Sequence, residues 1–496
     1  MNSTTARALE RIQELKDLSG AMAVLGWDQE TYMPKKGAGG RAAQMATLSG
    51  IYHEKLVDPM LGDWLAATAN GPGDEGAMAR ALKRERDRSV NVPVALVKAL
   101  AEAQSTGVEV WKESRAARDF KRFAPALETL LRLRREQADA IGHQSERYDA
   151  LLDGHEPQMR AARLKTVFEA LKTKLVPIAR ALLERPAPKD IFAGKTFAHA
   201  GQEAFTLEVL KSMGFDLDAG RQDKSAHPFS SGTHREDVRL TTRYSDDTPL
   251  PAIFGTIHEG GHGLYEQGFD PKDDRTPLSA AASFGLHESQ SRLWENMIGR
   301  SPQFWAHFFP VLVRHLPGPL AGVTAHDFVR AANRVERSLI RVEADEVTYN
   351  LHIILRFDLE LRLFRDELKI ADLEAAWNES SQELLGRKPA HSGEGVLQDI
   401  HWSFGEFGYF PTYAVGNLYA ASILAAAERA LPNLWTDVEK GQLVPLREWL
   451  RREIHHQGSR LFAEELVTRV TGRGLSDDDF VGYLKRKYGR LYDCSL

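Results

Sequence analysis

The sequence predicts a large, mostly α-helical protein that carries one small β element. Apolar residues recur at three- and four-residue spacing over most of the chain, which is the period of a helix that buries one face. Stretches rich in Gly, Pro and polar residues interrupt this pattern, and only one stretch alternates apolar and polar residues as a strand does. The chain has 496 residues, of which 43% are hydrophobic and 27% charged, so it has the composition of a globular protein with a large core.

Helical segments follow one another from the N-terminus. Residues 5–26 place Leu9, Ile12 and Leu15 on one stripe that continues to Met22. Pro125 is expected to open another helix, because proline suits the first helical position. The same pattern predicts helices over residues 160–184, 303–316, 325–343, 346–370, 412–431 and 445–471.

The one clear strand is predicted from Asp237 to Tyr244, where Val238 and Leu240 alternate with polar residues. The preceding segment Ser225–Phe229 is its expected partner. Because no internal repeat, low-complexity tract or long linker divides the chain, we predict a single domain over residues 1–496.

Composition argues against several classes of function. The chain has 64 Lys and Arg against 69 Asp and Glu, a net charge of −5, whereas nucleic-acid binding needs clustered positive charge. Cys494 is the only cysteine, so no disulfide forms within the chain, and its place near the C-terminus does not suit a nucleophile. The N-terminus lacks the apolar core of a signal peptide, and the longest apolar stretch, residues 414–427, is too short for a bilayer. We therefore expect a cytoplasmic protein with no nucleic-acid or membrane partner.

The strongest chemical signal is the segment His258-Glu259-Gly260-Gly261-His262, which has the form H-E-x-x-H. On a helix, two imidazoles four residues apart share one face and can chelate zinc, while Glu259 lies beside the open coordination position. Thr248 and the prolines after it predict the start of this helix, and Gly268 predicts its end.

Two glycines stand in the middle of this predicted helix, where each costs about 1 kcal/mol relative to Ala. We therefore expect a substrate or another helix to approach closely at Gly260 and Gly261. The metzincin extension is absent, because Tyr265 and Gly268 stand where it needs Gly and His. The third metal ligand must come from another segment.

The next predicted helix offers two candidates for that ligand, Glu288 and Glu295. A helical hairpin through the loop that holds Pro271 and Pro277 would return either carboxylate to the first helix, giving the two-His, one-Glu set of thermolysin-like zinc sites. The residues alone leave this choice open. With such a set, zinc acidifies a water, and Glu259 accepts the water's proton and later gives it to the leaving amine.

Further motifs are spread in order along the chain. The first two along the chain are Trp27–Thr31 and Tyr148–Leu152. The others are His227-Pro228-Phe229, Asp237-x-Arg239-x-Thr241, the H-E-x-x-H segment, His287-Glu288-Ser289-Gln290, Ile340-Arg341-x-x-Ala344-Asp345 and Gly395-x-x-Gln398-Asp399-x-His401-Trp402. Together these segments resemble the thermostable, Taq-type metallocarboxypeptidase family.

The resemblance favours Glu288 over Glu295 as the third ligand, beside His258 and His262. It implies removal of single residues from peptide C-termini with broad side-chain tolerance. It also implies a neurolysin-like, nearly all-helical fold in which two lobes flank a long substrate groove, and commonly a homodimer. Zinc is the metal it implies, one per chain, and cobalt can substitute for it.

A carboxypeptidase must bind a free carboxylate, which the guanidinium fork of arginine does best. Arg341 is the first candidate and Arg239 the second. The alternative for Arg341 is a salt bridge to Asp345, four residues later. Arg239, on the predicted strand, could instead anchor its own loop.

The tetrahedral intermediate of peptide hydrolysis needs a hydrogen-bond donor. Tyr413 is the first candidate and Tyr409 the alternative, in a loop-to-helix stretch that resembles that of related oligopeptidases. His227 and His401 are candidates for an oxyanion or substrate-carbonyl contact, and Asp399 for orienting an imidazole. As buried aromatics, both tyrosines could instead be purely structural.

Two other functions compete with the carboxypeptidase interpretation. An endopeptidase or oligopeptidase would use the same metal site and differ only in what closes the substrate site. A helical scaffold that binds peptides without hydrolysis would have no use for a base beside the metal, so Glu259 argues against it.

Overall fold

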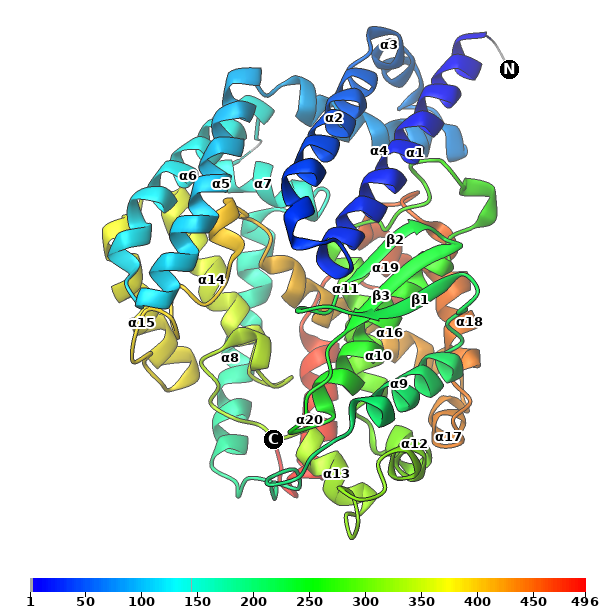
Figure 1. Cartoon of the computed structure of the whole chain (residues 1–496), viewed down its shortest axis with the longest axis vertical. Helices are drawn as coiled ribbons and strands as arrows, with labels where there is room; N and C mark the ends of the chain where they lie inside the picture. The colour runs from blue at the N-terminus through cyan, green and yellow to red at the C-terminus, as the bar shows by residue number, and fades with distance from the viewer. Residues whose placement is uncertain (1–2, 144) are drawn as a thin grey trace. The chain divides into compact units, whose positions relative to one another are not determined.

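The computed structural model describes residues 3–143 and 145–496. Helices make up most of this part of the chain, and its three strands form a single sheet (Figure 1). The predicted fold class, mostly α with a small β element, is therefore confirmed. The helices and the sheet belong to two compact units, each built from three stretches of the chain.

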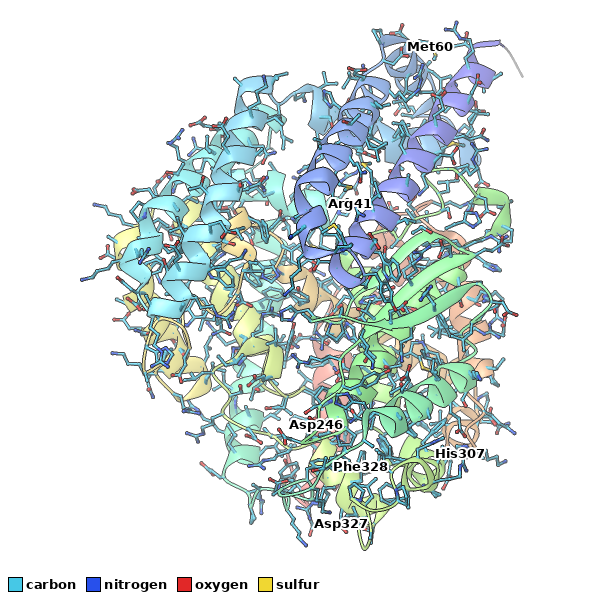
Figure 2. All side chains as sticks on the ribbon, viewed as in Figure 1. Arg41, Met60, Asp246, His307, Asp327 and Phe328 are labelled. Atoms are coloured by element: carbon cyan, nitrogen blue, oxygen red, sulfur yellow. The ribbon has the colours of Figure 1, made fainter. Side chains whose placement is uncertain are left out.

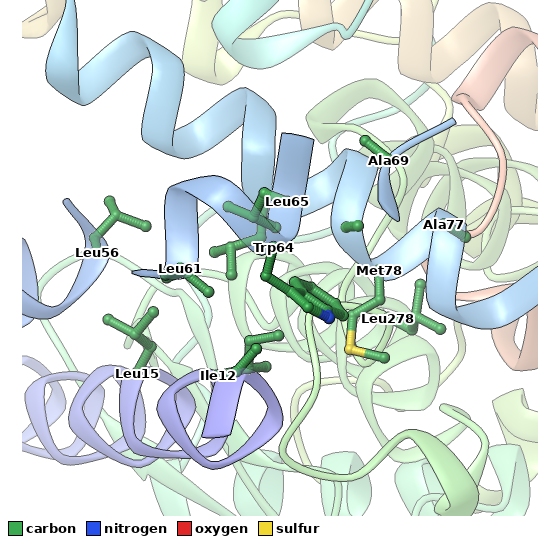
Figure 3. Close-up of a cluster of buried hydrophobic side chains, with 13 residues drawn as sticks. Ile12, Leu15, Leu56, Leu61, Trp64, Leu65, Ala69, Ala77, Met78 and Leu278 are labelled. Atoms are coloured by element: carbon green, nitrogen blue, oxygen red, sulfur yellow. The ribbon is translucent and has the colours of Figure 1, made fainter. Parts of the chain in front are cut away.

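The first unit comprises the residues up to Ser89, Pro188–Ala332 and Tyr419–Gly474. Its N-terminal helices pack through buried apolar side chains, with Trp64 among Ile12 and Leu61 (Figure 3). The helices of this unit are α1 (Ser3–Thr31), α2 (Ala38–Leu56), α3 (Pro59–Thr68), α4 (Gly73–Val90), α9 (His199–Met213), α10 (Leu250–Gln267), α11 (Phe284–Arg292), α12 (Pro302–His315), α13 (Ala325–Ala332), α17 (Leu434–Glu439), α18 (Val444–Glu453) and α19 (Ala463–Thr471).

Aromatic side chains join α12 to α13 in the first unit. Phe328, labelled in Figure 2, lies 4.2 Å from Trp305 between ring centroids and 5.6 Å from Phe309. All three rings are buried. The short helix α13 is thus held by ring packing rather than by its own length.

The sheet of the first unit lies against α10. Strands β1 (Gly220–Lys224), β3 (Asp237–Thr242) and β2 (Ser230–His234) are hydrogen-bonded in this order, with β1 parallel and β2 antiparallel to β3. The Thr256 hydroxyl of α10 donates to Thr242 of β3 at 3.2 Å. The predicted strand is present. Its predicted partner, residues 225–229, is the connection between β1 and β2, and the two ends of this connection bond to β3: the Ser225 N–H donates to the Thr242 carbonyl at 3.2 Å, and the Thr241 N–H donates to the Phe229 carbonyl at 2.9 Å. The pairing strands themselves lie on either side of the predicted segment.

The second unit comprises Val90–Ala187, Asn333–Leu418 and Leu475–Leu496. Its helix α14 (Tyr349–Phe364) is buried along almost its whole length. Helix α16 (Pro411–Ala430) begins in this unit and continues along the chain into the first. The other helices are α5 (Val94–Ala117), α6 (Phe120–Ile141), α7 (Arg147–His155), α8 (Ala161–Leu183), α15 (Leu373–Leu385) and α20 (Asp478–Leu491).

Two predicted helix boundaries are wrong, one for a local reason and one because of a distant partner. Helix α6 begins at Phe120, before Pro125, because the Asp119 side chain accepts a hydrogen bond from the Lys121 N–H at 3.0 Å and caps the helix there. Helix α13 ends at Ala332 and does not reach residue 343. Beyond it the backbone N–H of Val335 donates to the Tyr492 hydroxyl, a partner that no local pattern indicates.

The helix predicted over residues 445–471 is divided in the structure into α18 and α19. Gly458 lies between them with a positive φ of 51°. A Cβ at this position would lie 1.9 Å from the carbonyl oxygen of Leu278, so the chain passes directly over another backbone segment. This tertiary contact requires the break.

The helix that carries H-E-x-x-H runs from Leu250 to Gln267 with Gly268 as its C-cap, as predicted. A Cβ at Gly260 would lie 2.7 Å from a methyl carbon of Leu210 in α9. A Cβ at Gly261 would lie 2.7 Å from both the carbonyl oxygen of Gln290 and the Cα of Ser291 in α11. Helices are therefore the close neighbours that these two glycines accommodate.

No described helix is both long and apolar enough to cross a membrane.

The packing at Gly261 predicts opposite effects for two substitutions in one helix. Gly261→Ala pushes a methyl group into the backbone of α11 and should lower the free energy of unfolding by about 1–3 kcal/mol. Gly255→Ala is the matched control, because its Cβ meets nothing closer than Pro228 at 3.6 Å. It should raise stability by roughly 0.5–1 kcal/mol through helix propensity. Denaturant unfolding of both variants checks this, and equal stabilities would contradict it.

Candidate active site

Two imidazoles on α10 and one carboxylate on α11 converge in the first unit. His258 and His262 stand one turn apart with ring centroids 4.9 Å from each other. Oε2 of Glu288 lies 3.7 Å from Nε2 of His258 and 3.4 Å from Nε2 of His262. One ligand atom from each residue lies within 4.8 Å of the others, so the three side chains can share one ion.

The separations of these atoms fit a metal centre. Zinc bonds of about 2.0–2.2 Å in tetrahedral geometry place neighbouring ligand atoms roughly 3.3–3.6 Å apart. The observed distances of 3.4 and 3.7 Å are close to this range and longer than most hydrogen bonds. Two neutral imidazoles and a carboxylate are donors that zinc accepts, with a fourth position left for water or substrate.

Glu295 contacts the other nitrogen of one of these histidines. Its Oε2 lies 2.9 Å from Nδ1 of His258, and Arg300 donates to its Oε1 at 3.1 Å. It stands in the π-helical segment Leu293–Ile298 that follows α11. The structure thus groups Glu288 with both Nε2 atoms and gives Glu295 the contact that fixes the orientation of an imidazole.

Arg292 links the two carboxylates. It donates to Oε1 of Glu288 at 2.6 Å and to Oε2 of Glu295 at 3.3 Å. Burial alone would raise the pKa of Glu288, but the charges of Arg292 and His258 hold it well below the usual value. Glu288 is therefore a carboxylate, which is the form a metal ligand needs.

Glu259 is buried on α10 directly after His258. Burial raises the pKa of its carboxyl to about 7, with the neighbouring charge of His258 opposing that shift. Among the described residues, no hydrogen bond ties down this side chain in the way that Arg292 ties down Glu288. A carboxyl of this kind can both accept and release a proton near neutral pH.

His287 is a further member of the cluster that motif spacing did not assign a role. Its ring stacks on that of His262, with centroids 4.4 Å apart and planes at 18°. Its Nε2 lies 2.8 Å from Oε1 of Glu266 on α10. The only signal in the sequence was its place directly before Glu288.

Two candidate substrate-contact residues near the sheet, Arg239 and His227, differ in their exposure and in their partners. Arg239 makes a two-point contact with Asp237, at 2.8 and 2.9 Å, and its guanidinium lies 4.5 Å from the ring centroid of Trp27. These contacts correspond to the alternative in which Arg239 anchors its own segment. His227 is exposed in the connection between β1 and β2, and its carbonyl accepts a hydrogen bond from Ser225 at 2.6 Å.

A second cluster of polar side chains lies in the second unit around Arg341, whose side chain is buried. Its Nε donates to Oδ1 of Asp399 at 2.9 Å and its Nη1 donates to the Tyr349 hydroxyl at 2.9 Å. The predicted alternative, a salt bridge to Asp345, is wrong. Asp345 instead accepts from the N–H groups of Val347 and Thr348 at 2.9 and 3.0 Å in the turn that leads into α14.

Asp399 accepts hydrogen bonds from two arginines rather than from an imidazole. Its Oδ2 accepts from Nε of Arg356 at 2.8 Å, while its Oδ1 accepts from Arg341. Within the described residues, Nδ1 of His401 is buried without a hydrogen-bond partner. The expectation that Asp399 orients this imidazole is therefore wrong.

His401 and the two candidate tyrosines lie together. Nε2 of His401 is 3.3 Å from the Tyr413 hydroxyl, and the rings of His401 and Tyr409 are 5.4 Å apart. Burial, aided by the charge of Arg341, lowers the pKa of His401 to about 4. The imidazole is therefore neutral near pH 7, so one ring nitrogen can donate a hydrogen bond and the other can accept one.

Sequence reasoning missed two buried residues of α14 that contact this cluster, Arg356 and Glu360. The Trp402 indole N–H donates to Oε1 of Glu360 at 2.7 Å. The available signal was the presence of ionisable residues inside the Leu- and Ile-rich stretch of residues 349–364, because such residues are rarely buried without partners.

Comparisons with known proteins agree with this geometry. The chain matches the Carboxypeptidase Taq (M32) metallopeptidase family over residues 7–488. It is 43% identical to Thermostable carboxypeptidase 1 of Thermus thermophilus and 37% identical to Carboxypeptidase 1 of Bacillus subtilis. The first alignment covers 98% of both chains and the second covers 97% of both.

A solved structure gives the same result at the level of the fold. The M32 carboxypeptidase from Deinococcus radiodurans superimposes with a TM-score of 0.96 at 38% identity, covering 99% of this chain and 100% of the other. The chain therefore belongs to the Taq-type (M32) carboxypeptidase family and is a metal-dependent peptide hydrolase.

Proposed function

We propose that this enzyme is a zinc carboxypeptidase that releases single C-terminal residues from peptides and tolerates many side chains. Zinc is held by His258, His262 and Glu288, one ion per chain, and Glu259 is the general base. The observation that carries the proposal is the convergence of both Nε2 atoms on one carboxylate oxygen, at 3.7 and 3.4 Å. Cobalt suits the same nitrogen and oxygen donors and is expected to substitute.

The proposed mechanism combines the metal with side chains that act as a base, an oxyanion donor and two substrate-carbonyl contacts. When bound, the metal supplies Lewis-acid polarisation of the substrate carbonyl and acidifies the attacking water. Glu259 accepts the proton of that water and passes it to the leaving amine. Tyr413, with Tyr409 as the alternative, donates a hydrogen bond to the carbonyl oxygen as it gains negative charge. We assign the substrate-carbonyl contact to His401, and a further contact of the same kind to His227.

We propose that Arg341 binds the C-terminal carboxylate of the substrate. In the hydrogen-bonded group Arg341, Asp399 and Arg356, two guanidiniums share one carboxylate, so the group has an excess of one positive charge. A buried excess charge is costly and favours an anionic partner. Arg239 ranks second, because its two-point pair with Asp237 balances its charge and leaves no such excess.

We also propose that the two compact units act together as one catalytic domain spanning residues 1–496. Cytoplasmic location and assembly as a homodimer remain predictions. Sedimentation of the purified enzyme tests the second of these.

Product mapping and one isosteric substitution test the proposed reaction. Peptides with a free C-terminus should lose single residues in sequence by mass spectrometry, while amidated peptides should resist cleavage. Internal cleavage of amidated peptides would favour the endopeptidase alternative.

Glu259→Gln should lower kcat by about 10²–10⁴-fold, because no base remains to accept the proton. Metal analysis should show unchanged zinc content, and wild-type turnover by this variant would refute the assignment of the base.

The contact between Glu295 and His258 predicts weaker metal binding when the charge is removed. Glu295→Gln should lower zinc affinity by about 10–100-fold, because an oriented imidazole is a better ligand. Competition with a chelator measures this. Glu208→Gln is the matched control, since Glu208 contacts Nε2 of His315 at 2.8 Å outside the candidate metal centre. Equal zinc affinities for the two variants would show that Glu295 has no such role.

The assignment of Arg341 predicts a defect in substrate binding. Arg341→Gln should raise KM for free-acid peptides by about 10–100-fold, because a charge-assisted hydrogen bond contributes roughly 1.5–3 kcal/mol. Zinc content should not change. Arg365→Gln, which breaks a two-point contact with Glu146 in the same unit, is the control and should leave KM unaltered. An unchanged KM for Arg341→Gln would exclude it as the carboxylate-binding residue.

A further inference from the structure

Helix α14 carries two fully buried ionisable residues one turn apart, Arg356 and Glu360, each 0% exposed. Both bind the segment 399–408, which leads from Asp399 past His401 to the start of α16. Burying a charge is costly unless partners compensate for it. Two such residues one turn apart on a buried helix therefore need an explanation beyond stability.

Arg356 holds the start of this segment. Its guanidinium donates to Oδ2 of Asp399 at 2.8 Å and to the carbonyl of His352 at 2.8 Å. It also lies 4.6 Å from the ring centroid of Trp377 and 5.3 Å from that of Phe410. Asp399 is thereby fixed, and with it the guanidinium of Arg341 on its other oxygen.

Glu360 holds the middle and the end of the segment. Its Oε1 accepts from Trp402 Nε1 at 2.7 Å, and its Oε2 accepts from the backbone N–H of Gly408 at 3.0 Å and from the Tyr148 hydroxyl at 2.7 Å. Burial raises the pKa of its carboxyl to about 7, although all three donors oppose that shift. The retained carboxyl thus has an energetic cost that its role as a triple acceptor explains.

Gly408 shows how tightly the end of the segment is held. Its φ is +80°, which favours glycine, and a Cβ there would lie 2.8 Å from the backbone nitrogen of Leu152 in α7. Tyr148, also of α7, donates to the same carboxylate oxygen as Gly408. Glu360 therefore joins α7, α14 and the segment at one point.

We propose that Arg356 and Glu360 are positioning residues for the peptidase reaction, because they hold the segment 399–408 in the conformation that orients Arg341, His401 and Tyr413. Neither residue is assigned a contact with the substrate. The inference rests on the proposed roles of the three oriented side chains, and it adds the element that determines their geometry. A displacement of about 1 Å at a catalytic group can cost about 10²-fold in rate.

The test uses the isosteric variant Glu360→Gln in the full-length, metal-loaded enzyme. An amide cannot accept all three hydrogen bonds, since one of its two polar atoms only donates. We expect kcat/KM for a free-acid peptide to fall by about 10–100-fold with zinc content unchanged. We also expect faster amide hydrogen exchange in residues 398–413, with exchange in α10 and α11 unaltered. Arg356→Met should give the same pattern, with the larger part of the loss in KM because Arg341 loses its fixed partner.

A matched control and a milder variant separate positioning from general stability. Glu346→Gln changes a carboxylate of the same unit that is 7% exposed and accepts from Lys487 and Tyr488, so it should leave kcat/KM and exchange in residues 398–413 as in the wild type. Trp402→Phe removes a single donor to Glu360 and should give a smaller loss of the same kind. This milder variant provides the measurement if Glu360→Gln does not fold.

Hydrogen exchange is measured without substrate, so its result does not depend on the proposed roles. Unchanged exchange in residues 398–413 and wild-type kinetics in Glu360→Gln would overturn the inference, as would a loss of activity that only follows a global rise in exchange. If His401→Ala and Tyr413→Phe have wild-type turnover, the proposed roles of those two residues fail, and this outcome is distinct from a failure of the segment to respond.

Discussion

The close approach of α10 and α11 is the constraint on which the candidate metal centre depends. Gly261 removes the side chain that would separate the two helices, so the backbone of Gln290 and Ser291 lies directly against α10. A glutamate side chain is short, and only at this spacing does Oε2 of Glu288 come within 3.4 and 3.7 Å of the two imidazoles. The helix accepts the unfavourable propensity of mid-helix glycine because packing compensates for it.

Shared charges organise both polar clusters in the same way. In the first unit Arg292 lies between two carboxylates, Glu288 and Glu295. In the second unit the carboxylate of Asp399 lies between two guanidiniums, Arg341 and Arg356. Arg300 also donates to Glu295, so the first arrangement is balanced, whereas the second leaves one excess positive charge where an anionic substrate group is expected. Buried groups of this kind seldom add to stability, so their retention fits sites built for ligands.

The helical periodicity and the H-E-x-x-H spacing are local information, and they sufficed for the fold class, for the bounds of α10 and for the side on which His258 and His262 stand. Predictions of helix ends from the local pattern were wrong where a residue distant along the chain contacts the backbone. Tyr492 binds the N–H of Val335 beyond α13, and Leu278 packs against Gly458 between α18 and α19. Strand β1 was missed for a related reason, because it lies parallel to β3 and reaches it through a crossover that alternation along one strand does not encode.

The choice between Glu288 and Glu295 shows most directly where sequence reasoning stops. Both glutamates follow the same loop on what reads as one continuous helical segment, so spacing leaves them equivalent, and a resemblance rather than a physical argument separated them. The π-helical turn after Arg292 and the contact between α10 and α11 give each carboxylate a different imidazole nitrogen. The same holds for the contacts of Arg356 with Asp399 and of Glu360 with Trp402, which join residues 43 and 42 positions apart along the chain. Residue types and local spacing are properties of short segments, whereas the pairing of buried charges depends on which segments pack together, and that is fixed only when the whole core forms.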